Sequence, residues 1–264
     1  RHQARRRGKS GLRATAGSSV GIASSATSHV GDSYEPTQGV VSYRRRQPAH
    51  AGGDGCCAQR TRENGSEFGR AGKAGKMLRV ALRQVLINSA DGRMVSRLTQ
   101  AMTKVIQADA TNRRGLRNVI DGEAELLTGF EFNIGGKLGT TLFAPFEATI
   151  DRVSGNIGLT LAPFVPTTMI AAPAGTTHFK IISAGAAIDF EAEKFEVTTS
   201  ETAVLPWDST LTAPINQDNS VSANSTNPLF LALGVEFYQE VNGQMYPLKN
   251  GAHNPLSLVQ VVGL

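Results

Sequence analysis

The sequence has 264 residues, of which 40% are hydrophobic and only 6% aromatic, so aliphatic side chains must fill most of any core. This length suits one or two domains. No run of about 18 apolar residues is present and no apolar stretch follows the basic N-terminus, so we expect no transmembrane helix and see no secretory signal peptide. A cytoplasmic location is the default expectation on that basis. The two cysteines, Cys56 and Cys57, are adjacent and therefore poorly placed to cross-link a fold.

Charge is distributed unevenly along the chain. Residues 1–118 carry 22 Lys and Arg against 7 Asp and Glu, a formal net charge of +15, whereas residues 119–264 carry 5 against 15, a net charge of −10. A basic half joined to an acidic half is compatible with an arm that binds nucleic acid. It is equally compatible with two halves that attract each other, or with a first segment that is not native.

Residues 1–59 are rich in Arg, Ser, Gly and Ala and show no sustained apolar period. Such a segment buries too little apolar surface to offset the entropy of ordering, about 1–2 kcal/mol per backbone residue, so we expect it to be disordered. The chain starts with Arg1, and its first methionine is Met77. Our hypothesis is that this stretch is an out-of-frame or non-native leader.

Residues 60–118 are predicted to form a basic helical hairpin, because apolar residues recur at three- and four-residue steps in two stretches separated by a break at residues 88–92. Gly69, Gly72 and Gly75 weaken the first helix, each by about 1 kcal/mol relative to Ala, and would let another element approach closely. The predicted apolar faces are Phe68, Ala71, Gly75, Leu78, Leu82 and Val85 in the first helix, and Met94, Leu98, Ala101, Met102, Val105 and Ile106 in the second.

From residue 119 the apolar period changes to two, which is typical of strands. The strongest pattern is that of Leu231, Leu233, Val235 and Phe237, which should lie at the centre of the core. Asn-Gly pairs at 242–243 and 250–251 suit the positive φ angles of type I′ turns and predict a three-strand meander that ends at residue 262. Further strands are predicted at 123–132, 138–143, 149–153, 156–161, 178–190 and 195–204.

Many short strands with almost no helix predict that residues 119–264 form an immunoglobulin-like β-sandwich. The predicted fold is therefore mainly β, an antiparallel sandwich preceded by an αα-hairpin and a disordered N-terminus. An open barrel is the competing architecture for the same strands.

Several long strings of this sequence resemble a family of uncharacterised bacterial proteins found mainly in Bacteroidota. They include TRENGSEFGRAGKAGK at 61–76, VIQADATNRRGLRNVIDGE at 105–123, MIAAPAGTTHFKIISAGAAIDFE at 169–191 and GVEFYQEVNGQMYPLKNGA at 234–252. The resemblance covers residues 60–264. It implies no activity and no functional residues, because the family has none assigned. Its members place a short patterned segment ahead of the TRENG run, and residues 1–59 depart from that pattern.

The sequence carries no clear signature of an enzyme. A catalytic triad would draw on His178 or His253 with Asp151, Asp189 or Asp208, but no G-x-S-x-G motif is present, and solvated or packed histidines explain the pattern as well. We therefore expect no catalytic residue and no cofactor.

Calcium is the one metal that the residue types suggest. Asp189, Glu191 and Glu193 alternate along a predicted strand, so their oxygen-rich side chains would share one face. EF-hand spacing is absent, and a charged strand edge that blocks aggregation explains the same residues. We expect no metal site here.

The basic residues of the predicted hairpin are the candidate contacts to nucleic acid. They would attract phosphate with a strong dependence on salt. No helix-turn-helix signature and no aromatic stacking platform accompanies them. The set consists of Arg79, Arg83, Arg93, Arg97, Lys104, Arg113, Arg114 and Arg117.

The function we predict is that of a non-enzymatic structural or protein-binding module. A rigid sandwich that presents loops and strand edges suits binding to another protein or to copies of itself. The alternative is a nucleic-acid-associated protein that binds the phosphate backbone through the basic hairpin. The sequence indicates no membrane partner and no small-molecule substrate.

Overall fold

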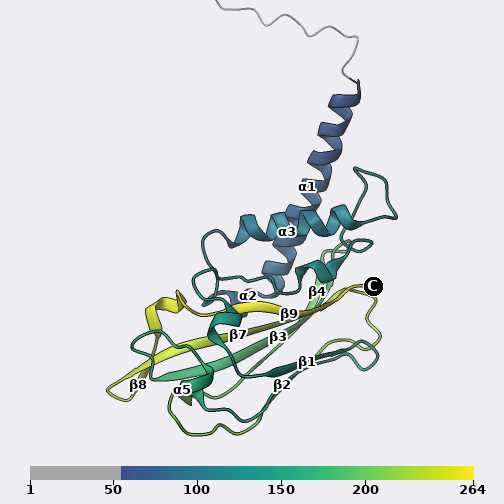
Figure 1. Cartoon of the computed structure of the whole chain (residues 1–264). Coiled ribbons are helices and arrows are strands. Elements are labelled where there is room, and N and C mark those ends of the chain that lie inside the picture. Colours follow the sequence, from purple (N-terminus) through teal and green to yellow (C-terminus); the bar gives the residue numbers. More distant parts are fainter. Residues whose placement is uncertain (1–54) are drawn as a thin grey trace, which may run out of the picture. The chain divides into compact units, whose positions relative to one another are not determined.

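The computed structural model describes residues 55–264, which are mainly antiparallel β-sheet with a few helices (Figure 1). Residues 1–54, most of the segment expected to be disordered, lie outside the described residues, whereas residues 55–59 begin the first helix. The helices are α1 Gly55–Ala81, α2 Arg83–Leu86, α3 Met94–Ala108, α4 Leu138–Thr141 and α5 Pro166–Met169, with single 3-10 turns η1 Ala124–Leu127 and η2 Leu248–Gly251.

The strands form two antiparallel sheets. The small sheet has the order β1-β2-β6, and the large sheet has the order β4-β3-β7, with β8 and β9 beside β7 and β5 beside β3. The strands are β1 Phe146–Asp151, β2 Asn156–Leu161, β3 His178–Asp189, β4 Lys194–Glu201, β5 Leu205–Pro206, β6 Ile215–Ser220, β7 Leu229–Val241, β8 Gln244–Pro247 and β9 Leu256–Val262.

Strand β7 lies in the middle of the molecule and is buried on both faces over most of its length. Leu231 and Leu233 pack toward the small sheet, while Phe230 and Ala232 pack toward the helices. A strand covered on both faces needs apolar residues at successive positions, which accounts for the sequence LFLALGVEF. The predicted shared face of residues 231, 233, 235 and 237 is confirmed, since all four are buried and lie in the core between the sheets.

Helices α1 and α3 cover the other face of the large sheet. Leu78 of α1 and Leu98 of α3 are fully buried in one core with Ile182 of β3 and Phe230 of β7. In Figure 1, α3 runs across α1 rather than along it, and the first turns of α1 extend beyond the crossing. The described residues therefore form a layer of helices, then the large sheet, then the small sheet, with apolar cores on both sides of the large sheet.

The predicted close approach at the glycines of α1 holds at one position. A Cβ built on Gly75 would lie 3.6 Å from Cγ of Leu98, so α3 packs directly on this residue. Gly69 and Gly72 face open space, with no atom within 4 Å of such a Cβ. Phe68, expected on the buried face, is 62% exposed.

Two predicted strands are wrong. Residues 123–132 form η1 and then an irregular segment along the outer edge of β9, where the N–H groups of Gly129 and Phe132 donate to the carbonyls of Leu258 (2.7 Å) and Leu256 (2.8 Å). Residues 138–143 begin with α4, because the Glu131 carboxylate accepts a hydrogen bond from the N–H of Leu138 (3.1 Å) at the start of that helical turn.

The end of the chain is not a meander. Strand β8 pairs with residues 238–241 of β7, and β9 pairs with residues 229–234 of the same strand. Asn242 and Gly243 do take the expected positive φ angles, +53° and +76°, and close a tight hairpin. Asn250 and Gly251 also have positive φ, but within η2, from which the chain returns to β7 instead of continuing along β8.

Candidate functional site

Strand β4 is an end strand of the large sheet and pairs with β3 alone. Just beyond the ladder, the N–H of Thr202 donates to the carbonyl of Ile181 (3.0 Å). Hydrogen-bonded positions alternate with non-bonded ones in an antiparallel pair, so Phe195, Val197 and Thr199 turn their N–H and C=O groups away from β3. These outward groups are a template for pairing with another strand.

The opposite edge of the large sheet is covered. Residues 129–132 run along β9, where Leu258 donates its N–H to the carbonyl of Phe130 (3.0 Å) and accepts from Gly129 through its own carbonyl (2.7 Å). The two edges of one sheet therefore differ: β9 is closed by the chain itself, and β4 presents unpaired backbone groups next to exposed side chains such as Phe195.

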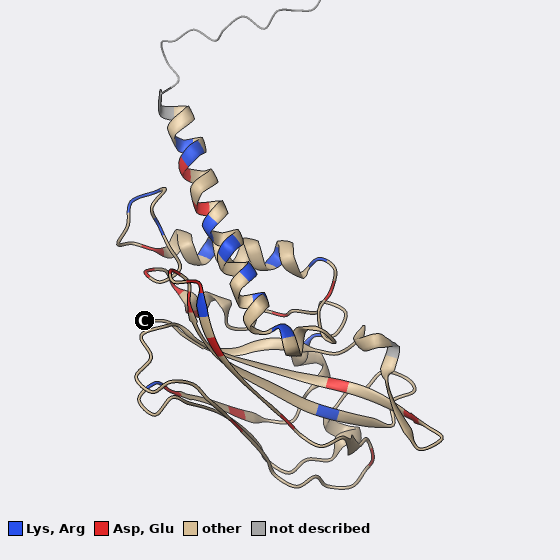
Figure 2. Cartoon of the chain, turned by 180° about the vertical axis from the view of Figure 1, so that it is seen from behind, with Lys and Arg blue, Asp and Glu red and all other residues tan. Residues whose placement is uncertain are grey.

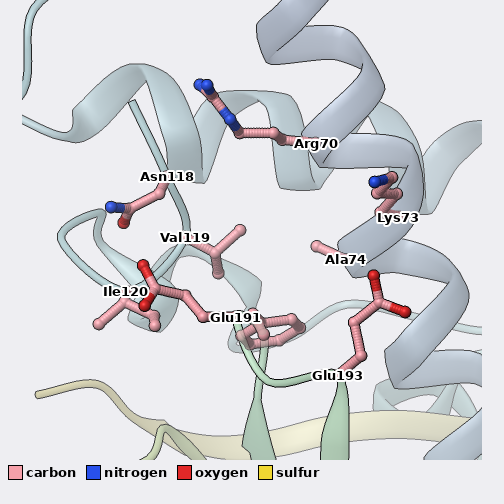
Figure 3. A pocket seen from close by; sticks show the side chains of 9 residues that line it. Arg70, Lys73, Ala74, Asn118, Val119, Ile120, Glu191 and Glu193 are labelled. Atoms are coloured by element: carbon pink, nitrogen blue, oxygen red, sulfur yellow. The ribbon is translucent and has the colours of Figure 1, made fainter. Parts of the chain in front are cut away.

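A hollow of about 300 Å³ opens between α1 and the turn from β3 to β4. Figure 3 shows Arg70 and Lys73 on the α1 side, with Glu191 and Glu193 on the turn. This turn hollow has basic residues on one wall, acidic residues on the other and an apolar floor. Its lining consists of Arg70, Lys73, Ala74, Asn118, Val119, Ile120, Phe190, Glu191 and Glu193.

A second hollow, of about 270 Å³, adjoins the turn hollow at the start of β4. Val80 of α1 and Phe195 of β4 are each 46% exposed, so an incoming apolar side chain would find apolar walls here. We call it the basic hollow because two lysines line it against one glutamate. Its residues are Lys73, Lys76, Met77, Val80, Glu193 and Phe195.

A third hollow, of about 410 Å³, lies at the other end of β4, on the same face of the large sheet. We call it the acidic hollow because its charged residues are Glu201 and Glu236. Gln84, Val85, Ile87, Ile182, Thr199 and Ser200 complete its lining. Strand β4 thus carries a basic hollow at its start and an acidic hollow at its end.

The two acids of the acidic hollow differ in how firmly they are held. Glu236 is buried, and its carboxylate accepts hydrogen bonds from Tyr238 Oη (2.6 Å) and Asn88 Nδ2 (3.0 Å). Burial, together with this bond to Glu236, raises the pKa of the Tyr238 hydroxyl above its ordinary value. Glu201 contacts Lys180 Nζ at 3.2 Å, but its side chain is 65% exposed, so it is accessible to a partner.

The predicted nucleic-acid residues are not brought together as one surface. Arg97 forms an ion pair with Asp91, donates to the carbonyl of Phe132 (3.3 Å) and lies 5.4 Å from the ring centroid of Phe130. Arg79 donates from Nε to the carbonyl of Gly75 (3.3 Å) within its own helix. The Arg97 guanidinium is therefore engaged within the protein, and Arg79 has one of its N–H groups engaged within its own helix.

The other members of that set are more accessible. Arg114 donates to Oδ1 of Asn64 (2.6 Å) and so ties the loop after α3 to α1, and Arg117 is half-buried. Figure 2 shows Lys and Arg spread over the helices and this loop. The exposed members are Arg83, Arg93, Lys104, Arg113 and Arg114.

His178, Asp151 and Asp208, which were considered for catalysis, have local partners. His178 Nδ1 lies 2.9 Å from Oγ1 of Thr177, and its Nε2 lies 3.9 Å from a carboxylate oxygen of Glu240. His253 is half-buried in the loop before β9. Asp151 accepts from the hydroxyl of Ser154 (2.6 Å), and Asp208 accepts from the N–H of Thr210 (2.8 Å).

The acids considered for calcium belong to the turn between β3 and β4. Asp189 accepts hydrogen bonds from the N–H groups of Glu191 (3.0 Å) and Ala192 (2.8 Å), which shapes the turn. Glu193 takes a left-handed φ of +53°. Among residues 55–264, no group of three His, Cys, Asp or Glu side chains is placed to hold a metal ion.

Comparisons with known proteins give no family assignment. No family model and no curated protein matches the chain, so the resemblance to the Bacteroidota proteins stays a prediction. One solved structure, from work on pH-induced modulation of Streptococcus parasanguinis adhesion by Fap1 fimbriae, is 14% identical, covers 44% of this chain and 80% of its own, and has a TM-score of 0.21. Within residues 55–264, the helices are all too short or too polar to cross a membrane.

The sequence predicted β4 to within a few residues but not its position at the edge of the sheet. The segment 195–204 was predicted as a strand, yet a strand at the edge of a sheet has the same alternation as one inside it. The sequence did not single out Lys73, Lys76 and Val80, because they come to line one hollow only through the packing of α1 beside β4. The signal that was present is the run of β-branched and aromatic residues in KFEVTTSE, flanked by charge.

Proposed function

We propose that this chain is a non-enzymatic protein-binding module that takes up an extended partner segment at the free edge of β4. The observation that carries the proposal is the outward row of backbone groups at Phe195, Val197 and Thr199. Main-chain hydrogen bonds to such an edge supply affinity, and hollows beside it select the partner's side chains. The basic and acidic hollows occupy those positions.

The order of the strands supports an immunoglobulin-like sandwich as the scaffold. On this proposal, β1, β2 and β6 would correspond to A, B and E of that fold, and β3, β7 and β9 to C, F and G. The fourth strand, β4, pairs with β3, whereas a constant-type domain pairs its fourth strand with E. This arrangement places β4 at the margin of the large sheet, and the pair of helices forms an added layer over the same sheet.

The experiment uses proline as a probe of the edge. Because the N–H of Val197 points away from β3, Val197→Pro removes a donor from the free edge and leaves the β3–β4 ladder intact. We would pan a display library of ten-residue peptides against the full chain and against this variant. Peptides that bind the natural chain should lose at least tenfold in affinity for Val197→Pro.

Two controls keep this experiment decisive. Val197→Thr retains the N–H and the β-branched shape, so it should bind the peptides as the natural chain does. Thr199→Pro blocks a second outward donor and replaces Val197→Pro if circular dichroism shows that the latter fails to fold. Hydrogen exchange should show protection of residues 195, 197 and 199 on binding. Peptides that bind both proline variants undiminished, or no enriched peptide, would refute the proposal.

A further inference from the structure

We infer that the strand added at this edge is β4 of a second copy, paired antiparallel so that Phe195 of each copy lies opposite Glu201 of the other. This inference rests on the proposed function and names the partner. A closed dimer with twofold symmetry uses the same patch on both subunits, and an open antiparallel edge meets that condition directly. The two large sheets would then continue into each other through β4.

The charge along β4 favours this partner. Antiparallel pairing brings the start of one β4 beside the end of the other. The basic hollow of each copy, with Lys73 and Lys76, would therefore meet the acidic hollow of its mate, where Glu201 is 65% exposed. A parallel strand of the same sequence would place basic beside basic and acidic beside acidic. The surface is thus complementary to itself in the antiparallel direction.

Charge also selects the register. Phe195, Val197, Thr199 and Glu201 lie at alternate positions, so outward backbone groups meet only if these residues pair with one another. A dimer axis at Val197 would bring Glu201 to Glu193, the turn residue just before β4, and like charges placed close together are destabilising. An axis at Thr199 opposes no like charges but pairs Glu201 with Val197, which does not line the basic hollow. An axis at Thr198 also opposes no like charges, and it pairs Val197 with Thr199 and Phe195 with Glu201.

This register places Glu201 of one copy beside Lys73 and Lys76 of the other copy. Phe195 lines the basic hollow together with Lys73 and Lys76, so the carboxylate that lands opposite Phe195 sits at the rim of that hollow. Phe195 and Glu201 project from the same face of the large sheet, the face that α1 covers. Each interface would contain this arrangement twice.

Disulfide cross-linking tests the register. Thr198 lies on the proposed axis and turns its own N–H and C=O toward β3, so the two Thr198 residues would form a non-hydrogen-bonded pair with Cα atoms about 4.5 Å apart. That separation suits a disulfide. In a full chain with Cys56→Ser and Cys57→Ser, Thr198→Cys should form a covalent dimer on mild oxidation.

The matched control is Val197→Cys in the same background, which should cross-link poorly because its partner is Thr199. Efficient cross-linking at 197 with none at 198 would overturn the proposed register. Failure at both positions, while sedimentation of the natural chain shows a dimer, would place the interface elsewhere and overturn the inference.

Charge reversal supplies an independent measurement by sedimentation equilibrium of the full chain. Glu201→Lys should weaken the dimer at least tenfold, as should Lys73→Glu combined with Lys76→Glu. All three changes in one chain should restore association to within about threefold of the natural value, since every proposed contact is then reversed in sign. Glu147→Lys, on exposed β1, is the control and should change nothing.

The outcomes separate this inference from the proposed function. The natural chain could prove monomeric while Val197→Pro still weakens binding of the display peptides. That result would support the edge as a binding site and would overturn the inference that a second copy is the partner. A dimer that persists in Val197→Pro and Thr199→Pro rejects β4 pairing and therefore the inference. A triple variant that fails to recover association also rejects it.

Discussion

Asn219 of β6 donates a hydrogen bond from Nδ2 to the hydroxyl of Ser183 in β3, 3.0 Å away, across the interior between the two sheets. Both residues are fully buried. Two positions earlier, Gln217 donates from Nε2 to the carbonyl of Ile181 (2.9 Å). Polar side chains therefore occupy two of the three positions at which β6 faces the core, and they tie the small sheet to the large one.

Ser183→Ala should destabilise the protein by about 1–3 kcal/mol, because the buried Asn219 amide would keep only its longer contact of 3.5 Å to the carbonyl of Ile157. Chemical denaturation of both proteins gives the difference in free energy of unfolding. Ser220→Ala, at an exposed position of β6, should change it by less than about 0.5 kcal/mol. Equal effects of the two substitutions would show that the buried bond adds nothing.

Strand β6 shows why part of the fold could not be predicted from the sequence. Apolar alternation predicted β3 and β7, because most of their side chains are buried in an apolar core. It missed β6, since Gln217 and Asn219 look solvent-facing unless the polar groups that receive them are known. The free edge of β4 could not be predicted for a related reason. The position of a strand at the edge of a sheet depends on pairings between distant segments and not on the strand's own residues.

Gly185 of β3 allows the two sheets to approach at this point. A Cβ built on it would lie 2.8 Å from Cβ of Asn219 and 3.1 Å from Cδ1 of Ile157, distances that require a shift of both strands. Gly185→Ala should therefore lower the free energy of unfolding by about 1–3 kcal/mol, the usual cost of overpacking a core. Thermal and denaturant unfolding would both report it.

Gly72→Ala is the matched comparison, since a Cβ on this helical glycine meets no atom within 4 Å. Ala favours a helix interior over Gly by up to about 1 kcal/mol, so this variant should be more stable than the natural chain. Opposite signs for the two Gly→Ala changes are the expected result. A loss at Gly72 comparable to that at Gly185 would contradict the placement of α1.

Arg97 should behave as a structural residue, unlike the exposed arginines of the helices. Its guanidinium pairs with Asp91 and donates to the carbonyl of Phe132, and 24% of its side chain is exposed. Arg97→Ala should cost about 2–3 kcal/mol of stability, because charged hydrogen bonds are lost and the Asp91 carboxylate loses its cationic partner. Arg93→Ala, at an exposed position, should fall within about 0.5 kcal/mol of the natural chain in the same denaturation assay.

The Asp91 carboxylate should make stability depend on acid pH. Burial would raise the pKa of Asp91, but hydrogen bonds from the N–H groups of Ile134 (2.9 Å) and Arg93 (2.6 Å), together with the Arg97 guanidinium, hold it below its ordinary value. A carboxyl whose pKa is lowered by folding stabilises the folded state above its unfolded pKa of about 3.9, and this contribution is lost as pH falls through the folded value. The difference in free energy of unfolding between the natural chain and Asp91→Asn should hold steady from about pH 7 to pH 5 and shrink below about pH 4. A difference that is the same at pH 7 and pH 3 would show that Asp91 contributes no such linkage.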